Sequence, residues 1–529
     1  MLLSKGMPVL QVRLGHALLT VATVGLLCWA IRLHQQYLAL AIDVQDTNPT
    51  GDSLPEEEYL ERLTGRYVLG NLTEWQAWRV QTSRVQSLAA GSVTDVHADF
   101  QPDRDAPKVI HVDNPSPTDL RASKGLELAV HADQRQDGPY ASIFIFGIST
   151  SYSRIVEKDR AILRAWKRWL TKSDGTTNGA SLVLMLDNAT EEQLNEIDKA
   201  LEEAGIDVYA SSTAEPTSKI RRYHELIRVM KSYGATIAAS GQEKHWFAVV
   251  EDTVFFPSLS HLHQRLSTYD VSKQLYVSIP GEETDGQKDG RSVTKYGAGA
   301  IFLTKHAVSL IPKLSCMELD EAPKQPFHGQ RWDAELKKCL EKQTSIDMHV
   351  IPALHAPNEA SYEPPLEGHG IGVRPLLLND YEYRHRLDVG MAHLVTDACG
   401  DACFMHQYLF HDNWVIINGV SISHHPDGLS HHRHSRNAAG KGHLFKDAQR
   451  SRVSSQTSAH QDEAERRPVT WTGRRDVWRL LDSTKASDET IWQAYIKRGG
   501  KPAKEDGGKP DGLKELDSII VLIWEKRQH

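Results

Sequence analysis

The pattern of hydrophobic and polar positions is sharpest between residues 141 and 256, where short apolar runs alternate with longer helical segments. The apolar runs have the length of buried strands and end near residues 148, 186, 210 and 250. The segments between them carry apolar residues at helical spacing and cover 154–170, 190–204 and 218–233. Strands that alternate with helices are typical of a largely parallel sheet with helices on both faces. This part of the chain is therefore predicted to have an α/β fold.

Start and stop signals delimit two of these helices. Thr190 and Gln193 have the spacing of a capping box, in which each side chain binds the backbone amide of the other residue. Gly205 and Gly234 follow the apolar positions of two helices, and glycine is the residue that most often follows a helix end. Both helices are expected to end just before these glycines.

The chain on either side of this region has weaker patterns. Residues 43–138 mix charged residues with Pro and Gly, so they are predicted to form a stem with a local helix near 56–67. Residues 430–467 are polar with few apolar positions, which predicts a disordered linker. Beyond Val469 the pattern recovers, and the apolar run 519–524 predicts a strand that packs on the main domain or belongs to a small module.

A histidine-rich tract lies where the predicted linker begins. An exposed loop is the favoured interpretation of such a tract, and metal binding is the alternative. The tract comprises His424, His425, His431, His432 and His434.

The N-terminal stretch 14–31 is almost wholly apolar, and a run of about 18 residues is just sufficient to cross a bilayer. Lys5 and Arg13 precede it, so the positive-inside tendency places the N-terminus in the cytosol and the body of the protein in a lumen. An uncleaved signal-anchor is the favoured interpretation. The alternative is a signal peptide that is removed near Ala39-Leu40-Ala41, which would release a secreted protein.

Length and composition limit the number of domains and the class of protein. A chain of 529 residues can hold two domains, or one large domain with appendages. Its 40% hydrophobic and 25% charged residues are those of an ordinary globular protein. The formal net charge of −8 argues against a nucleic-acid-binding protein, which normally has a basic face. The predicted organisation is a cytosolic tail (1–13), a transmembrane signal-anchor (14–32), a stem (33–138), a main domain (139–428), a polar linker (429–467) and a small C-terminal module or packing segment (468–529).

Two further features fit a lumenal body. Asn71 and Asn188 begin N-glycosylation sequons. Four of the five cysteines lie beyond the anchor, and their spacing favours two disulfides. A zinc site is the less favoured alternative, because neither pair has the Cys-x-x-Cys spacing. The expected pairs are Cys316–Cys339 and Cys399–Cys403.

The candidate chemistry is concentrated where a predicted strand ends in Glu251 and Asp252. In α/β sheets, ligands bind in the crevice outside the carboxyl ends of the strands. Carboxylate oxygens suit Mg²⁺ or Mn²⁺, the ions that hold diphosphates. Asp187 follows another predicted strand in the same way. The alternative interpretation of each acid is a solvated turn after a core strand.

Four landmarks follow one another along the main domain. The first carries Ser149, Thr150 and Arg154, and the second is the acidic segment 246–256. The third is the glycine-rich turn 296–300 with Gly297 and Gly299, and the fourth is 329–339 with Asp333 and Glu335. Their order and spacing over residues 141–428 resemble those of the Fringe-like β1,3-glycosyltransferases (glycosyltransferase family 31), most closely the fungal members.

The resemblance implies an inverting glycosyltransferase with a GT-A-like, Rossmann-type mixed sheet and helices on both faces. The donor would be a UDP-sugar, and the enzyme would move a hexose or N-acetylhexosamine to a hydroxyl of a glycan or glycoprotein, in a β1,3 linkage. Mn²⁺ or Mg²⁺ would neutralise the departing diphosphate. The resemblance also implies a single-pass type II protein of the Golgi membrane with a lumenal catalytic domain.

The resemblance assigns roles to individual residues. Asp252 would bind the metal, with Glu251 beside it. Asp333 would be the base that removes the acceptor proton, with Glu335 as the second choice; the alternative for Asp333 is the N-cap of a helix. The remaining residues would contact the nucleotide sugar: Ser149, Thr150, Arg154, Asp187, Gly297, Gly299 and Arg221, the last being one of three basic residues (Lys219, Arg221 and Arg222) that open a helix.

The sequence departs from the family in two places. Val250 takes the position of the family's first acid, and Asn379 and Asp380 take the positions of a histidine pair. Asp380 is the expected third metal ligand, because its carboxylate can bind Mn²⁺ through oxygen. These departures favour a second hypothesis, a catalytically silent relative that binds glycans or partner proteins in the lumen. A hydrolase is not supported, because neither a Gly-x-Ser-x-Gly elbow nor a His-Glu-x-x-His motif is present.

Overall fold

The protein is seen here in a computed structural model, which describes residues 55–85, 93–101, 107–122, 124–131, 141–172, 174–281, 295–314, 332–346, 348–351, 376–379, 387–431, 469–471, 473–499 and 516–525. The chain divides into two compact units, Met1–Glu61 and Arg62–His529. Helix α2 (Pro55–Arg66) confirms the local helix expected near 56–67. The predicted anchor lies outside the described residues, and none of the helices within them is long and apolar enough to cross a membrane.

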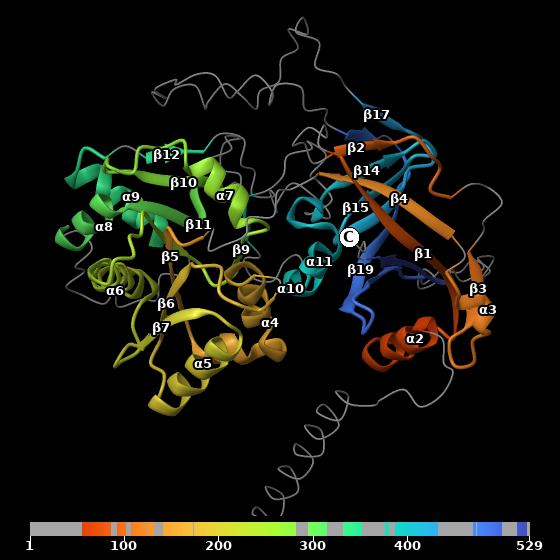
Figure 1. The fold of residues 1–529 in the computed structure, drawn as a ribbon, viewed down its shortest axis with the longest axis horizontal. Coiled ribbons are helices and arrows are strands. Elements are labelled where there is room, and N and C mark those ends of the chain that lie inside the picture. Colours follow the sequence, from red (N-terminus) through yellow and green to blue (C-terminus); the bar gives the residue numbers. More distant parts are fainter. Residues whose placement is uncertain are drawn as a thin grey trace, which may run out of the picture. The chain divides into compact units, whose positions relative to one another are not determined.

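A seven-stranded mixed sheet forms the α/β part of the second unit (Figure 1). Its strand order is β12-β10-β11-β8-β5-β6-β7. Strands β5, β6, β7 and β8 are parallel, whereas β11 runs antiparallel to both of its neighbours. The bounds are β5 Phe144–Thr150, β6 Ser181–Leu186, β7 Asp207–Ser212, β8 Trp246–Val250, β10 Tyr276–Gly281, β11 Lys295–Thr304 and β12 Met348–Val350. The predicted α/β fold with a largely parallel sheet is confirmed for this region.

Helices cover both faces of this sheet, as the alternation predicted. Phe146 and Ile148 of β5 belong to a buried cluster with side chains of α4, α5 and α7. Ile145, which points to the opposite face, belongs to a second cluster with α6, α8 and α9. The bounds are α4 Tyr152–Leu170, α5 Glu191–Glu203, α6 Lys219–Ala239, α7 Leu259–Leu266, α8 Lys305–Leu310 and α9 Trp332–Gln343.

The predicted start and end of α5 are confirmed, whereas the predicted end of α6 is wrong. The capping box is present, with Thr190 Oγ1 accepting from the Gln193 amide and Gln193 Oε1 accepting from the Thr190 amide. Gly205 follows α5 with a φ of +82°, the left-handed conformation that glycine adopts freely. Gly234, however, lies inside α6 and does not end it. A Cβ at Gly234 would lie 2.6 Å from a ring carbon of Phe247, so this glycine allows close packing of α6 on β8.

A second sheet of ten strands is built from both ends of the chain. Its order is β2-β14-β15-β16-β19-β20-β21-β1-β3, and β4 pairs with β1 beside this path. The N-terminal strands are β1 Leu72–Val85, β2 Val93–Val96, β3 Lys108–His111 and β4 Lys124–His131. The C-terminal strands are β14 Gln407–Phe410, β15 Trp414–Ile417, β16 Ser421–His424, β19 Asp476–Lys485, β20 Ile491–Lys497 and β21 Asp517–Trp524.

This second sheet differs from the predicted organisation. Residues expected to form a stem supply β1 to β4, and the last strands of the expected main domain belong to this sheet as well. The apolar run 519–524 does form a strand, β21, which pairs in parallel with β1 so that Trp75 lies opposite Ile519. Local patterns do not reveal such a pairing, because its partners lie more than 400 positions apart and β1 carries polar side chains at its exposed positions.

Several short elements lie outside these two sheets. They are α3 Pro117–Leu120, β9 Val254–Phe255, η1 Ile311–Lys313, β13 Leu378–Asn379, α10 Val389–Ala392, η4 His393–Val395, α11 Thr396–Cys399, η5 Asp401–Cys403, β17 Leu429–His431 and β18 Val469–Trp471. The predicted disulfide Cys399–Cys403 is present. Cys339 is also disulfide-bonded, but its predicted partner Cys316 lies outside the described residues.

The histidine-rich tract is not simply an exposed loop. His424 ends β16 and stacks on Trp414, with ring centroids 4.7 Å apart. His425 is buried, and its Nε2 lies 3.0 Å from Ser423 Oγ. The tract therefore begins as part of the second sheet, and His432 and His434 lie outside the described residues.

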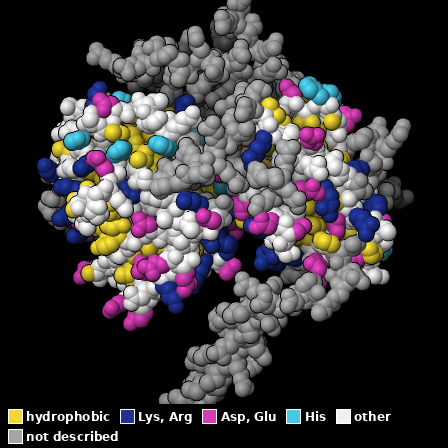
Figure 2. All heavy atoms as spheres, viewed as in Figure 1, with side chains coloured by type: hydrophobic (Ala, Val, Ile, Leu, Met, Phe, Trp, Pro, Cys, Tyr) yellow, Lys and Arg dark blue, Asp and Glu magenta, His cyan; other side chains and the backbone are white. Residues whose placement is uncertain are grey.

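On the described surface visible in Figure 2, acidic and basic side chains are intermixed.

Candidate functional site

The parallel strands β5, β6 and β8 bring their carboxyl ends to one edge of the seven-stranded sheet. In this register Thr150 lies opposite Leu186, and Ile148 lies opposite Val250. The residues that follow these strands therefore meet at the edge where α/β sheets bind ligands. Asp187, Glu251 and Asp252 are three of them, as the sequence predicted.

Asp252 is bound by the last residue of β5 and by the first turn of α4. Its Oδ2 accepts a hydrogen bond from Thr150 Oγ1 at 2.6 Å and another from Arg154 Nε at 3.3 Å. Arg154 lies in the first turn of α4, which is capped by Ser151. The first two sequence landmarks are thus in direct contact.

Glu251 is bound by three other elements. Its Oε1 accepts from Lys219 Nζ of α6 at 2.7 Å and from Trp332 Nε1 of α9 at 3.0 Å. Its backbone amide donates to the carbonyl of Gly299 in β11 at 2.8 Å. The fourth landmark and the glycine-rich segment therefore converge on the acidic segment.

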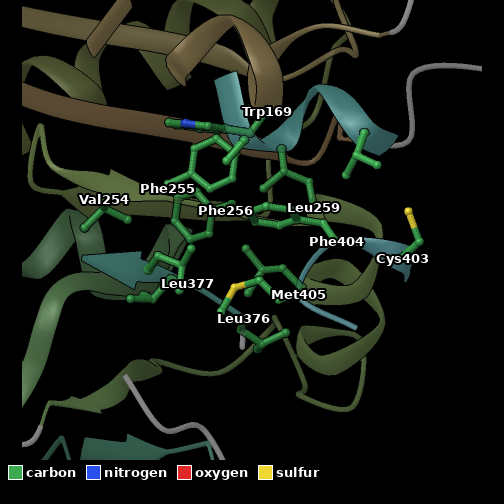
Figure 3. Packing of buried hydrophobic residues seen from close by; sticks show 14 of the residues in the cluster. Trp169, Val254, Phe255, Phe256, Leu259, Leu376, Leu377, Cys403, Phe404 and Met405 are labelled. Carbon is green, nitrogen blue, oxygen red and sulfur yellow. The ribbon is translucent and has the colours of Figure 1, made fainter. Parts of the chain in front are cut away.

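The hydrophobic residues after Asp252 anchor the acidic segment in the core. Val254 and Phe255 form β9, and Phe256 packs against Trp169 with ring centroids 5.0 Å apart (Figure 3). The ring of Phe256 also lies 5.4 Å from that of Phe146. Because this anchor is buried, the two carboxylates are held in place between β8 and β9.

The backbone conformation and the close neighbours of Gly299 both require glycine at this position. Its φ is +77°, and a Cβ there would lie 2.6 Å from Asn379 Nδ2 and 3.1 Å from Glu251 Oε2. Asn379 in turn accepts a hydrogen bond through Oδ1 from Thr253 Oγ1 at 2.6 Å. Thr253 therefore links the turn before β9 to β13. Gly297 lies in β11 too, and Asp380 lies outside the described residues.

Asp187 is held by α6 and the loop before it. Its Oδ2 accepts from Arg222 Nη1 at 2.8 Å, and its Oδ1 accepts from the Thr217 amide at 3.1 Å. Arg222 also donates through Nε to Ser149 Oγ at 3.1 Å. Of the three basic residues that open α6, Lys219 and Arg222 contact the acids, whereas Arg221 is exposed. Helical spacing was the missed signal, because residues three apart share a helix face.

Asp333 lies in the first turn of α9 and is buried at 1% exposure. Burial, and then the charges of Glu251, Asp252 and Asp333, raise the pKa of Tyr223 well above its usual value. Burial and then Asp333 do the same for the pKa of Tyr276. Glu335, the second candidate base, pairs instead with Lys338 at 2.6 Å. Asp333 directly follows Trp332, which donates to Glu251, so it lies at the end of α9 that contacts the acidic segment.

The metal expected at this edge is not matched by the described donor set. Within the described residues, no group of three acids, histidines or cysteines could hold a metal ion. Val250 is fully buried and apolar, and Glu251 and Asp252 each contact a basic side chain.

No protein-family model matches the sequence, and no curated protein matches it. Among solved structures, the chain is similar to a glycosyltransferase involved in glycosylation of the major capsid of PBCV-1 (14% identity, 46% of this chain and 97% of that one, TM-score 0.25). It is also similar to 4-diphosphocytidyl-2C-methyl-D-erythritol synthase from Anaerococcus prevotii (15%, 40% and 89%, TM-score 0.25). A third similarity is to a glucose-1-phosphate thymidylyltransferase described as putative, from Bacillus anthracis (10%, 39% and 85%, TM-score 0.25). Similarities at this level establish neither the fold nor the activity of the chain.

Proposed function

We propose that the protein is a glycosyltransferase that uses a nucleotide sugar as its donor. One observation carries the proposal: at the carboxyl edge of the sheet, each of three acids is paired with a basic side chain. The pairs are Asp187–Arg222, Glu251–Lys219 and Asp252–Arg154. Carboxylates can accept hydrogen bonds from ribose or sugar hydroxyls, and Lys and Arg bind phosphates. A nucleotide sugar carries both kinds of group.

The polar residues at this edge fall into two groups. Asp187, Arg222 and Ser149 form a linked polar group suited to the nucleoside. Lys219 and Arg154 are partly exposed, at 43% and 31%, and are suited to the diphosphate. Taken with the Fringe-like resemblance, this division supports UDP as the nucleotide, a hexosyl or N-acetylhexosaminyl group as the sugar, and a glycan or glycoprotein hydroxyl as the acceptor.

Inverting transfer requires a base that takes the acceptor proton while the acceptor oxygen attacks the anomeric carbon. We assign this role to Asp333. Its helix is tied to the edge by Trp332, which donates to Glu251. Membership of the Fringe-like family, the β1,3 linkage and the Golgi type II topology remain parts of the same proposal.

A second candidate function is a catalytically silent protein that binds glycans or partner proteins. The observation that favours it is the pairing of Glu251 and Asp252 with basic residues, which leaves no described set of metal ligands. The two functions differ in one property. A transferase binds UDP and releases it from a UDP-sugar, whereas the silent protein does neither.

The test is a calorimetric titration of UDP into the full chain, followed by a screen for UDP release from UDP-sugars with a glycan acceptor. Asp187→Ala is the site variant, and Asp198→Ala, in the middle of α5, is the matched control. We expect UDP binding that Asp187→Ala weakens about 10-fold, the loss of roughly one charge-assisted hydrogen bond, and that the control leaves unchanged. Absence of UDP binding in the folded wild-type chain would refute the transferase and leave the silent protein.

A further inference from the structure

We propose that Lys219 and Arg154 bind the diphosphate of the donor in place of a divalent cation, so that donor binding does not require metal. This inference rests on the proposed function. It adds that the charge needed to neutralise the departing diphosphate is built into the protein.

The first observation concerns the position of Lys219. Its ammonium group lies 2.7 Å from Glu251 Oε1, and Trp332 Nε1 donates to the same oxygen. A carboxylate oxygen has two lone pairs in its plane, so two donors fill its normal capacity. A metal ion would have to displace one of these donors to bind that oxygen, and it would also bring a second positive centre next to the ammonium group.

The second observation repeats this arrangement at the neighbouring acid. Asp252 Oδ2 accepts from both Thr150 Oγ1 and Arg154 Nε. The position before the two acids is Val250, whose side chain is fully buried and cannot be a ligand. Both acids at the tip of β8 are thus engaged in the same way, each by one cation and one neutral donor.

The third observation is a difference in exposure within each pair. The side chain of Lys219 is 43% exposed and that of Glu251 is 9% exposed. Arg154 is 31% exposed and Asp252 is 16% exposed. The cationic side chains are thus more exposed to solvent than the carboxylates with which they pair, which favours the approach of an anion to the cations. The acids hold the cations at the edge of the sheet, where Arg154 also pairs with the exposed Glu157 at 3.8 Å. Ammonium and guanidinium groups form charge-assisted bonds to phosphate oxygens.

This arrangement assigns a role to each group during transfer. The acceptor oxygen forms a bond to the anomeric carbon, and the bond from that carbon to the diphosphate oxygen breaks. The electron pair of the broken bond leaves with the nucleoside diphosphate, where Lys219 and Arg154 balance the charge. The acceptor proton passes to Asp333. No oxidant, reductant or further reactant is required.

The test is UDP titration into the full chain in EDTA and in Mn²⁺. The cation variants are Lys219→Met and Arg154→Met, and the acid variant is Asp252→Asn. The controls are Lys199→Met and Arg228→Met, whose cations pair with exposed glutamates elsewhere. We expect equal affinity within about 3-fold in EDTA and Mn²⁺, a loss of about 10-fold or more in each cation variant, and retained binding in Asp252→Asn.

Each other outcome identifies what has failed. Binding that needs Mn²⁺ and disappears in Asp252→Asn would overturn the inference and leave the proposed transferase intact. Binding in EDTA that neither cation variant weakens would also overturn the inference alone. If the wild-type chain has a cooperative thermal transition but binds no UDP in either buffer, the proposed function fails together with the inference.

Discussion

Trp332 of α9 and Tyr223 of α6 stack face to face, with ring centroids 4.1 Å apart and an angle of 4° between the rings. Each ring also contacts the acidic segment, because Trp332 Nε1 donates to Glu251 and the Tyr223 hydroxyl donates to the carbonyl of Val250 at 3.1 Å. The stacked pair therefore joins two helices to the end of β8. It makes the position of α9, and with it Asp333, dependent on α6.

The first prediction separates the two contributions of Trp332. Trp332→Ala removes a fully buried ring and should lower the free energy of unfolding by about 3–5 kcal/mol. Trp332→Phe keeps an aromatic ring for the stack and loses the hydrogen bond to Glu251, so it should cost about 1–2 kcal/mol. Urea denaturation of both variants measures the difference. Equal losses would mean that the hydrogen bond, and not the stack, dominates.

The second prediction concerns Gly299. Gly299→Ala should lower the free energy of unfolding by about 2–4 kcal/mol, because the added Cβ meets Asn379 and the backbone has a positive φ. Gly175→Ala is a matched control, since Gly175 has a φ of +80° but a Cβ added there would have no atom within 4 Å. The control should cost about 1 kcal/mol. If thermal denaturation shows equal losses, the contact with Asn379 is unimportant.

The sequence predicted the α/β part well because its elements are locally encoded. Apolar runs such as 181–186 are buried on both faces, and the capping box at Thr190 is complete within four residues. The end of α6 was predicted wrongly at Gly234 because the role of this glycine is not locally encoded. Its role is to let Phe247 approach α6, and this contact depends on a residue of another strand.

The second sheet and part of the site depend on contacts between distant residues. β1 is paired by β21 and β4, and none of its local neighbours reveals those partners. At the site, acids after strands and glycines in a motif were recognisable. The choice of Lys219 and Arg222 over Arg221 depends on which side of α6 faces the sheet, which requires the packed structure.

The third prediction is a dependence of stability on pH through His425. Burial, and then the charge of Arg475, lower the pKa of His425 from 6.5 to about 4. Between these two values the unfolded chain takes up a proton that the folded chain excludes. The stability associated with the neutral side chain is therefore complete above pH 6.5 and is lost as the pH falls toward 4.

The measurement is urea denaturation from pH 7 to pH 4.5. His425→Gln should remove this component, so the difference in unfolding free energy between the wild type and the variant should shrink as the pH falls. His111→Gln, at an exposed position in β3, is the control for the substitution of a histidine by glutamine. A difference that stays constant with pH would contradict the prediction.

The fourth prediction concerns a carboxylate inside the second sheet. Asp482 is fully buried and accepts hydrogen bonds from Arg62 and the Tyr67 hydroxyl, both at 3.2 Å. Asp482→Asn should cost about 1–3 kcal/mol of unfolding free energy, less than for a wholly buried pair because Arg62 is 30% exposed. Glu196→Gln breaks an exposed pair with Arg160 and should cost less than about 0.5 kcal/mol. Urea denaturation measures the unfolding free energy of both variants. Guanidinium chloride is unsuitable because it is a salt and screens the ion pairs that are compared.

The last prediction tests which acid of α9 is the base. Asp333→Asn should lower turnover of a UDP-sugar about 100-fold or more while UDP binding persists, because the lost group acts on the acceptor proton. Glu335→Gln should change turnover by less than about 2-fold, since Glu335 pairs with Lys338 and lies on the more exposed side of the helix. UDP release at saturating donor measures both variants, and urea denaturation reports their folding. An Asp333→Asn variant that loses stability but keeps its turnover per folded molecule would make Asp333 a structural residue beside Tyr223 and Tyr276. A loss of turnover confined to Glu335→Gln would transfer the role of base to Glu335.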